Sequence, residues 1–499
     1  MTILGVGGRT AMISQSLVNL RTQLDDLQRQ LGSGKRSDDY AGLGLDRGLT
    51  VGLRSNLSAL DGYDDTITHV GVRLDLAQTV LGRIDSISHE LKSTALQFSQ
   101  AGGEVFANGQ TQVQTIALAK FGEALGLLNT QAGDRYLFSG RATDQPSVET
   151  MSKILDGDGA RAGLRQVIDE RNQADLGASG LGRVTVTKPS PTSVAVTEDG
   201  VHPFGFKVAA ISTTFSGATV TGPIGAPPAV SVDLGATNPS DGQNVQIRFN
   251  LPDGTTETIT MTATTSPTPG PNEFAIGLNS TATATNLQTA LSTAVGKLAD
   301  TSLSAASAVA AGSNFFANPP MRVAGPPFNS ATALVAGTPL NTVSWYTGEV
   351  GTDPARQSAV AQIDQSTAIA YGTRANEEGV RWIIQQTAVM AAMTFSPADP
   401  DASARSAALN QRLMPLLDVP SGVQTIENIQ SELAGTQNAL AGAKERHRQT
   451  GNVLQNLLQE IEGVSTEEVG AKILALQTRL QASLQTTAML FQNSLVNYL

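Results

Sequence analysis

Two heptad-like apolar patterns, one near each end of the chain, constrain the fold more than any other feature of the sequence. The N-terminal pattern consists of Ile13, Leu17, Leu20, Leu24, Leu27 and Leu31, and the C-terminal pattern of Val469, Ile473, Leu476, Leu480, Leu484, Phe491 and Leu495. An apolar residue about every 3.5 positions keeps one stripe of a helix facing a partner helix, which is typical of a coiled coil. Neither helix can bury its stripe alone. We therefore expect the two ends to pack on each other, on neighbouring subunits, or on both.

An ordinary helix pair within one chain is the simpler of these alternatives. Packing between subunits is favoured because terminal segments far from a domain core are only marginally stable without partners. The terminal patterns are accordingly interpreted as assembly seams.

The residues between the seams predict an α+β multidomain fold in the order helices, β-rich insertion, helices. Helical periodicity resumes at Leu45 and, after a polar break at Asp64 and Asp65, continues to Leu91. Helix-compatible sequence returns after Tyr346, and a long helix is expected from Val423. Turn residues around a short aromatic run predict a hairpin near 131–145, and alternating apolar residues predict another over 245–261. The long N- and C-terminal helices are expected to form an antiparallel coiled-coil or helical-bundle rod. The expected segments are 1–34, 35–178, 179–345 (the inserted β-rich surface domain), 346–462 and 463–499.

Charge and composition argue against several classes of partner. The net charge of −11 disfavours nucleic acid and anionic membrane surfaces, which attract lysine and arginine. The sequence has no run of 18 apolar residues, and its first 20 residues lack a basic region followed by an apolar one. We therefore expect no membrane insertion and no cleaved signal peptide, so export would use another route.

The sequence offers no recognisable catalytic or cofactor-binding constellation. It contains no cysteine, and no two of its four histidines share a metal-ligand spacing. His447 lies on an apolar helical stripe, where a hydrogen-bonded interface residue is the expectation. The middle region shows no convergent set of titratable residues. We therefore expect neither a catalytic site, nor a cofactor, nor a bound metal, and a non-enzymatic protein.

Two short motifs resemble those of a known family. After the first helix come Gly34, Arg36, Asp38, Asp39, Ala41, Gly42 and Leu43, and the predicted hairpin carries Tyr136, Phe138 and Gly140. The first motif resembles the N-terminal signature of bacterial flagellins, although it has fewer residues between Arg36 and Asp38 than is usual there. The second motif, together with the tail at 493–499, is similar to the hook–filament junction branch of that family. The resemblance covers roughly residues 10–175 and 345–499. A solvated turn is the alternative reading of residues 35–43.

The resemblance implies a structural subunit of the bacterial flagellum that supports motility. It implies type III export, an extracellular location, inner-tube positions for residues 1–34 and 463–499, and exposure of the middle region to the medium. The implied partners are further copies of the chain, other flagellar axial proteins (hook-associated proteins and flagellin) and a cytoplasmic export chaperone. Filament and junction roles both remain open. The alternative is a cell-surface or phage-type stalked binding protein whose β-rich domain recognises a ligand.

Overall fold

The chain divides into two compact units that alternate along the sequence. The structure, a computed structural model, describes residues 4–99 and 109–496, and the side chains of 11–98 and 109–489. The terminal unit comprises Met1–Gly71, Ala361–Ile369 and Gln437–Leu499, and the central unit comprises Val72–Val360 and Ala370–Thr436. The predicted α+β class is confirmed.

This division differs from the five expected segments. The expected borders at 34/35 and 462/463 lie inside the terminal unit, because the two long helices α2 (Arg47–Ser99) and α10 (Ile426–Glu462) each contribute residues to both units. The β-rich region is likewise not a unit of its own, since its contacts with the neighbouring helices place it in the central unit.

The terminal unit is made almost entirely of long helices. Its elements are α1 (Leu4–Ser33), the 3₁₀ segment η1 (Tyr40–Asp46), the first part of α2, the last part of α10, α11 (Thr466–Val496), and most of the hairpin β13 (Val360–Asp364) and β14 (Thr367–Ala370). Helix α2 is unbroken at Asp64 and Asp65, where the sequence predicted a polar break. One of these two carboxylates has a buried partner on α10, which removes the reason for a break.

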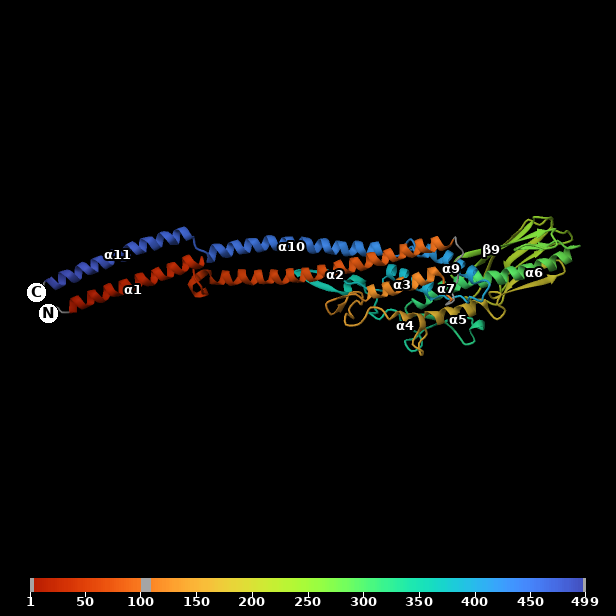
Figure 1. The fold of residues 1–499 in the computed structure, drawn as a ribbon, viewed down its shortest axis with the longest axis horizontal. Coiled ribbons are helices and arrows are strands. Elements are labelled where there is room, and N and C mark those ends of the chain that lie inside the picture. Colours follow the sequence, from red (N-terminus) through yellow and green to blue (C-terminus); the bar gives the residue numbers. More distant parts are fainter. Residues whose placement is uncertain (1–3, 100–108, 497–499) are drawn as a thin grey trace. The chain divides into compact units, whose positions relative to one another are not determined.

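The helices of the terminal unit pair in an antiparallel fashion. Helices α1 and α11 lie side by side with both chain ends at the same end of the pair (Figure 1). Between α2 and α10, Arg54 pairs with Glu462 and Asp64 with His447, so the residue number rises along one helix as it falls along the other. The unit therefore consists of two successive pairs of helices.

The central unit holds a helical part and a β-rich part. Its helices, besides parts of α2 and α10, are α3 (Gln112–Leu128), α4 (Met151–Asp156), α5 (Leu164–Leu176), α6 (Ser280–Leu298), α7 (Ser304–Phe315), α8 (Glu378–Ala392) and α9 (Ala402–Leu416). Short segments are η2 (Ala299–Leu303), η3 (Phe328–Ser330) and η4 (Ala355–Ser358), with hairpins β1 (Gln131–Ala132)/β2 (Arg135–Tyr136) and β11 (Met321–Val323)/β12 (Leu334–Ala336). The hairpin predicted near 131–145 is confirmed.

Helix α7 was not predicted and contacts α5, α8 and α9. It is built mainly from alanine, serine and glycine and is buried on nearly every side. Such a helix has no polar face, so it lacks the amphipathic period by which helices are found in sequence. Helix α7 belongs to the segment 179–345, which was expected to be β-rich, and it packs in the helical part of the central unit.

The β-rich part consists of two four-stranded sheets and α6. One sheet has the order β10-β9-β8-β5 and the other β3-β4-β7-β6. The strands are β3 (Val184–Ser190), β4 (Ser193–Glu198), β5 (Lys207–Thr213), β6 (Thr219–Ile224), β7 (Ala229–Asp233), β8 (Asn244–Asn250), β9 (Thr256–Thr264) and β10 (Glu273–Ala275). Antiparallel pairing of Ile247 with Ile259 confirms the hairpin predicted over 245–261.

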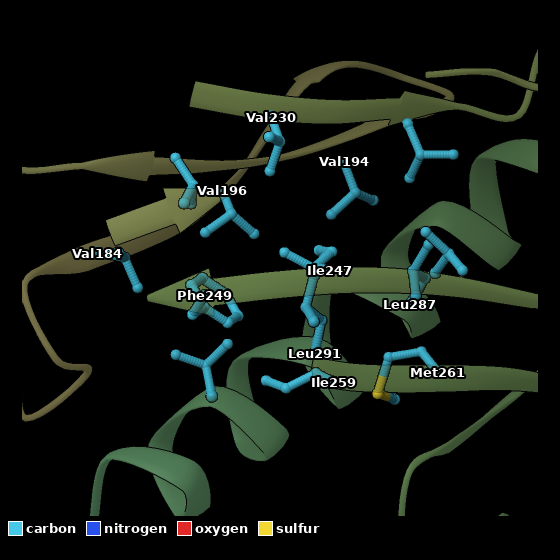
Figure 2. Packing of buried hydrophobic residues seen from close by; sticks show 14 of the residues in the cluster. Val184, Val194, Val196, Val230, Ile247, Phe249, Ile259, Met261, Leu287 and Leu291 are labelled. Carbon is cyan, nitrogen blue, oxygen red and sulfur yellow. The ribbon is translucent and has the colours of Figure 1, made fainter. Parts of the chain in front are cut away.

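Alternating apolar residues of the two sheets meet in one core. Figure 2 shows side chains of both sheets together with two leucines of α6: Val194, Val196, Val230, Ile247, Phe249, Leu287 and Leu291. Every second residue of β8 is buried, as expected for a strand with one face on a core. All residues of this core belong to the central unit.

We expect the change of Gln386 to Met to stabilise the central unit. Gln386 lies in α8, is fully buried, and neither of its amide atoms has a hydrogen-bond partner among the described residues. An unsatisfied buried polar group costs about 1–3 kcal/mol, and methionine has nearly the same shape, so the free energy of unfolding should rise by about that amount. Urea unfolding measures it. The neighbouring change Gln385→Met is the control and should destabilise, because the Gln385 amide donates to Ser313 Oγ at 2.9 Å.

Candidate assembly surface

The two predicted seams face each other over most of their length. In α1, five of the six seam residues are partly covered: Ile13, Leu17, Leu20, Leu24 and Leu27. In α11, Val469, Ile473 and Leu476 are buried and Leu480 is partly covered. One chain by itself therefore covers much of each stripe.

The ends of the seams depart from this arrangement. Leu31 is 42% exposed and Leu484 is 52% exposed. On α11 the covered face continues instead through Ser483 and Thr487, which keeps the alternation of three and four residues that Leu484 interrupts. The side chains of Phe491 and Leu495 lie outside the described residues.

The terminal unit exposes an unusual amount of apolar surface. Of the 22 strongly exposed large hydrophobic residues among those described, 12 belong to this unit, which holds less than a third of the chain. Only ten of its described hydrophobic residues are buried, and the rest of the core lies in the central unit. Leu45 in η1, Leu457 on α10 and Leu474 on α11 are among the exposed set. Because more than half of the strongly exposed apolar side chains among the described residues lie on this unit, it is the candidate interaction surface.

Sequence reasoning did not find these exposed residues. Leu474 lies next to a seam residue but on another side of the helix, and Leu45 lies in the connector. The only available signal was that apolar residues on these helices outnumber the positions of a single stripe.

The segment between α1 and α2 and the segment between α10 and α11 are joined by backbone hydrogen bonds. The amide of Arg36 donates to the carbonyl of Glu462 at 2.6 Å, and the amide of Val464 donates to the carbonyl of Gly34 at 3.2 Å. The Arg54 guanidinium makes two hydrogen bonds to the Glu462 carboxylate, at 3.0 and 2.7 Å, and these bonds raise the pKa of Arg54. The join between α1 and α2 is thus tied to the join between α10 and α11.

Most of the first motif has a local structural role. Gly34 ends α1 with a positive φ of 68°, where its amide donates to Gln30. Asp39 caps η1 by accepting from the amide of Gly42 at 2.9 Å, and a side chain at position 42 would collide with Ser37. Asp38 lies 3.3 Å from Arg29.

The two remaining residues of this motif differ in burial. Leu43 is buried and Ala41 is exposed. These contacts describe an ordered turn with one anchoring leucine.

The second motif lies in the central unit, whereas the first lies in the terminal unit. Phe138 is buried, its carbonyl accepts from the amide of Ala375, and the amide of Gly140 donates to the carbonyl of Thr373. Tyr136 pairs with Gln131 in the hairpin and is partly covered. The two motifs therefore form separate features of the fold.

His447 is a buried, hydrogen-bonded residue within the terminal unit, as the sequence indicated. Its Nδ1 lies 2.8 Å from Oδ1 of Asp64, its ring centroid lies 5.9 Å from that of Tyr63, and its Nε2 lies 3.9 Å from Oδ2 of Asp364. This polar contact fixes the register of α2 against α10 at one position along an otherwise repetitive pair.

Among the described residues, no cluster of three or more histidine, aspartate or glutamate side chains is arranged to hold a metal ion. Across the same residues, none of the helices combines the length and apolar character needed to cross a bilayer. Comparison of the whole sequence with protein-family models and with curated proteins finds no match.

Proposed function

We propose that this chain is a non-enzymatic structural subunit of the bacterial flagellum that polymerises through its terminal unit. The observation that carries the proposal is the concentration of exposed apolar side chains on a helical unit with few buried residues of its own. The motifs at 34–43 and 136–140 support the flagellin family as the setting.

In this proposal the covered and the exposed apolar residues of the terminal unit have different roles. The covered residues of α1 and α11 hold the two helices together as a rod-like, coiled-coil pair within each subunit. The exposed residues, with Leu474 as the clearest example, contact neighbouring copies. Burying apolar surface contributes about 25 cal/mol per Å², so contacts along helices of this length add up to a stable polymer.

A patch that packs on a different patch of the next copy produces an open, growing assembly rather than a closed dimer. The exposed residues of the terminal unit are spread over α1, α2, α10 and α11, so different helices can meet different neighbours. The β-rich part has its own core and does not need these contacts to fold.

The proposal includes location and partners. The subunit acts outside the cell after type III export without a cleaved signal peptide. It contacts further copies of itself and other axial proteins, namely hook-associated proteins and flagellin, and an export chaperone covers its terminal helices before export. Either a filament or a hook–filament junction subunit satisfies this description.

The test is seeded polymerisation of the purified full-length chain. Fragments of filament are added in ammonium sulfate, which strengthens apolar burial, and the products are examined by negative-stain electron microscopy. Long filaments are expected of a filament subunit, and short stubs that bind only to the seeds are expected of a junction subunit. A chain that stays monomeric and never binds the seeds would contradict self-assembly.

A further inference from the structure

The ring of His447 on α10 lies between two carboxylates that come from distant parts of the chain. Its Nδ1 lies 2.8 Å from Oδ1 of Asp64 on α2, and its Nε2 lies 3.9 Å from Oδ2 of Asp364. Asp364 ends strand β13, at the turn of the β13–β14 hairpin. All three residues belong to the terminal unit. The imidazole is 4% exposed, so its polar contacts come from the protein.

The hydrogen-bonding capacity of this ring is not satisfied when the ring is neutral. Nε2 is buried and has no hydrogen-bond partner among the described residues. A neutral imidazole has one N–H donor and one acceptor nitrogen, whereas an ionised carboxylate only accepts. Either neutral form therefore leaves one ring nitrogen facing an acceptor across a pair of lone pairs. Only the protonated ring, with an N–H at both nitrogens, matches both carboxylates.

The other polar groups around the ring do not change this balance. On α10, Lys444 lies one turn before the histidine and is exposed, and Glu445 and Arg448 pair with each other at 2.7 Å. On α2, the ring centroid of Tyr63 lies 5.9 Å from that of the imidazole. The two carboxylates are therefore the groups that respond to a positive charge on the ring.

The hairpin that carries Asp364 has few contacts to hold it. Ile363 is the one buried residue of the range 360–370, and a two-stranded hairpin is marginally stable by itself. Oδ1 of Asp364 accepts from the amide of Gln365 at 2.7 Å and so fixes the turn. The other carboxylate oxygen, Oδ2, is the one nearest His447. A hydrogen bond to Oδ2 would therefore hold the turn itself.

We propose that protonation of His447 creates a hydrogen bond from α10 to the β13–β14 hairpin and makes the attachment of this hairpin pH-dependent. The new N–H at Nε2 donates to Oδ2 of Asp364 once the two atoms approach by about 1 Å, while Nδ1 keeps its bond to Asp64. Histidine exchanges its proton between about pH 5 and 8, so the hairpin is held more firmly on the acidic side of this range. The inference concerns a single chain and is independent of the proposed polymerisation.

The test is hydrogen–deuterium exchange of the full-length monomer, followed in peptides that cover residues 360–370 and corrected for the intrinsic effect of pH on exchange. Protection of the hairpin should be about tenfold greater at pH 5.5 than at pH 8, as expected for one hydrogen bond between charged groups. His447→Gln should reduce this ratio to about one. The control His89→Gln removes an exposed histidine of α2, 3.6 Å from Asp85, and should keep the full ratio.

A second variant separates the proton from a merely structural role of the histidine. Asp364→Asn keeps the size of the side chain, but its amide can donate to an unprotonated Nε2. The ratio should then fall to about one or below it. A purely structural role of His447 would lower protection at both pH values and leave their ratio unchanged. A wild-type ratio near one, or a tenfold ratio that persists in either His447→Gln or Asp364→Asn, would overturn the inference.

Discussion

Replacement of Leu474 by aspartate should strongly weaken self-assembly while leaving the isolated chain folded. The Leu474 side chain is 66% exposed on α11, so a charge there costs little in the monomer. At a contact between copies the same charge would be buried without a partner. Loss of a central interface residue costs about 2 kcal/mol or more, so the critical concentration for polymerisation should rise at least about thirtyfold. Sedimentation of polymer against protein concentration measures this value.

Leu476→Asp is the matched comparison, two residues further along the same helix. Leu476 is only 9% exposed and lies in the face turned to α1. A charge at this position should separate α1 from α11 in the monomer, which circular dichroism and proteolysis would detect. If Leu474→Asp assembles at the wild-type concentration, the exposed face of α11 is not the contact between subunits.

The second large effect is expected at Asp175, a fully buried residue near the end of α5. Its carboxylate accepts from Arg171 Nε at 2.7 Å and from the amide of Gly205 at 2.8 Å. The change Asp175→Ala leaves the buried Arg171 charge without its partner, and such a loss costs about 3–5 kcal/mol. The free energy of unfolding, measured in urea by the fluorescence of the two tryptophans, should fall by about that amount.

The double variant Arg171→Met/Asp175→Leu tests the cause of this loss. If the unpaired charge is responsible, replacing both partners by apolar residues should recover most of the stability. Asp158→Asn, which breaks an ion pair with Arg161 in a loop, should change stability very little. A double variant as unstable as Asp175→Ala would show instead that the link to Gly205, at the entry to β5, is what matters.

Elements with a regular apolar period were predictable from the sequence, and those without one were not. The β8–β9 hairpin follows directly from the alternation of apolar residues in its two strands. Helix α7 was not predicted, because burial on nearly every side removes the contrast between an apolar and a polar face. The break expected at Asp64 did not occur because His447, which is distant in sequence, provides the partner.

The candidate surface was predicted only in part. The heptad pattern identified the faces by which α1 and α11 meet, including Ile473 and Leu476. The pattern also placed Leu484 on that face, and this was wrong. The helical period brings position 483 to the face instead, so Ser483 is partly covered and Leu484 is exposed.

The sequence by itself determined the helices and strands that have a regular apolar period, and most of the faces by which α1 and α11 meet. Those properties depend on residues close together in the chain, whose spacing sets the period of each element. Only the tertiary structure decided which apolar residues are buried within the chain and which remain exposed. Leu476, for example, is buried, whereas Leu474 is exposed. The tertiary structure also decided that Asp175 is buried with Arg171 as its partner while Asp169, on the same helix, is exposed. These outcomes depend on contacts between segments far apart in sequence, and no local pattern records them.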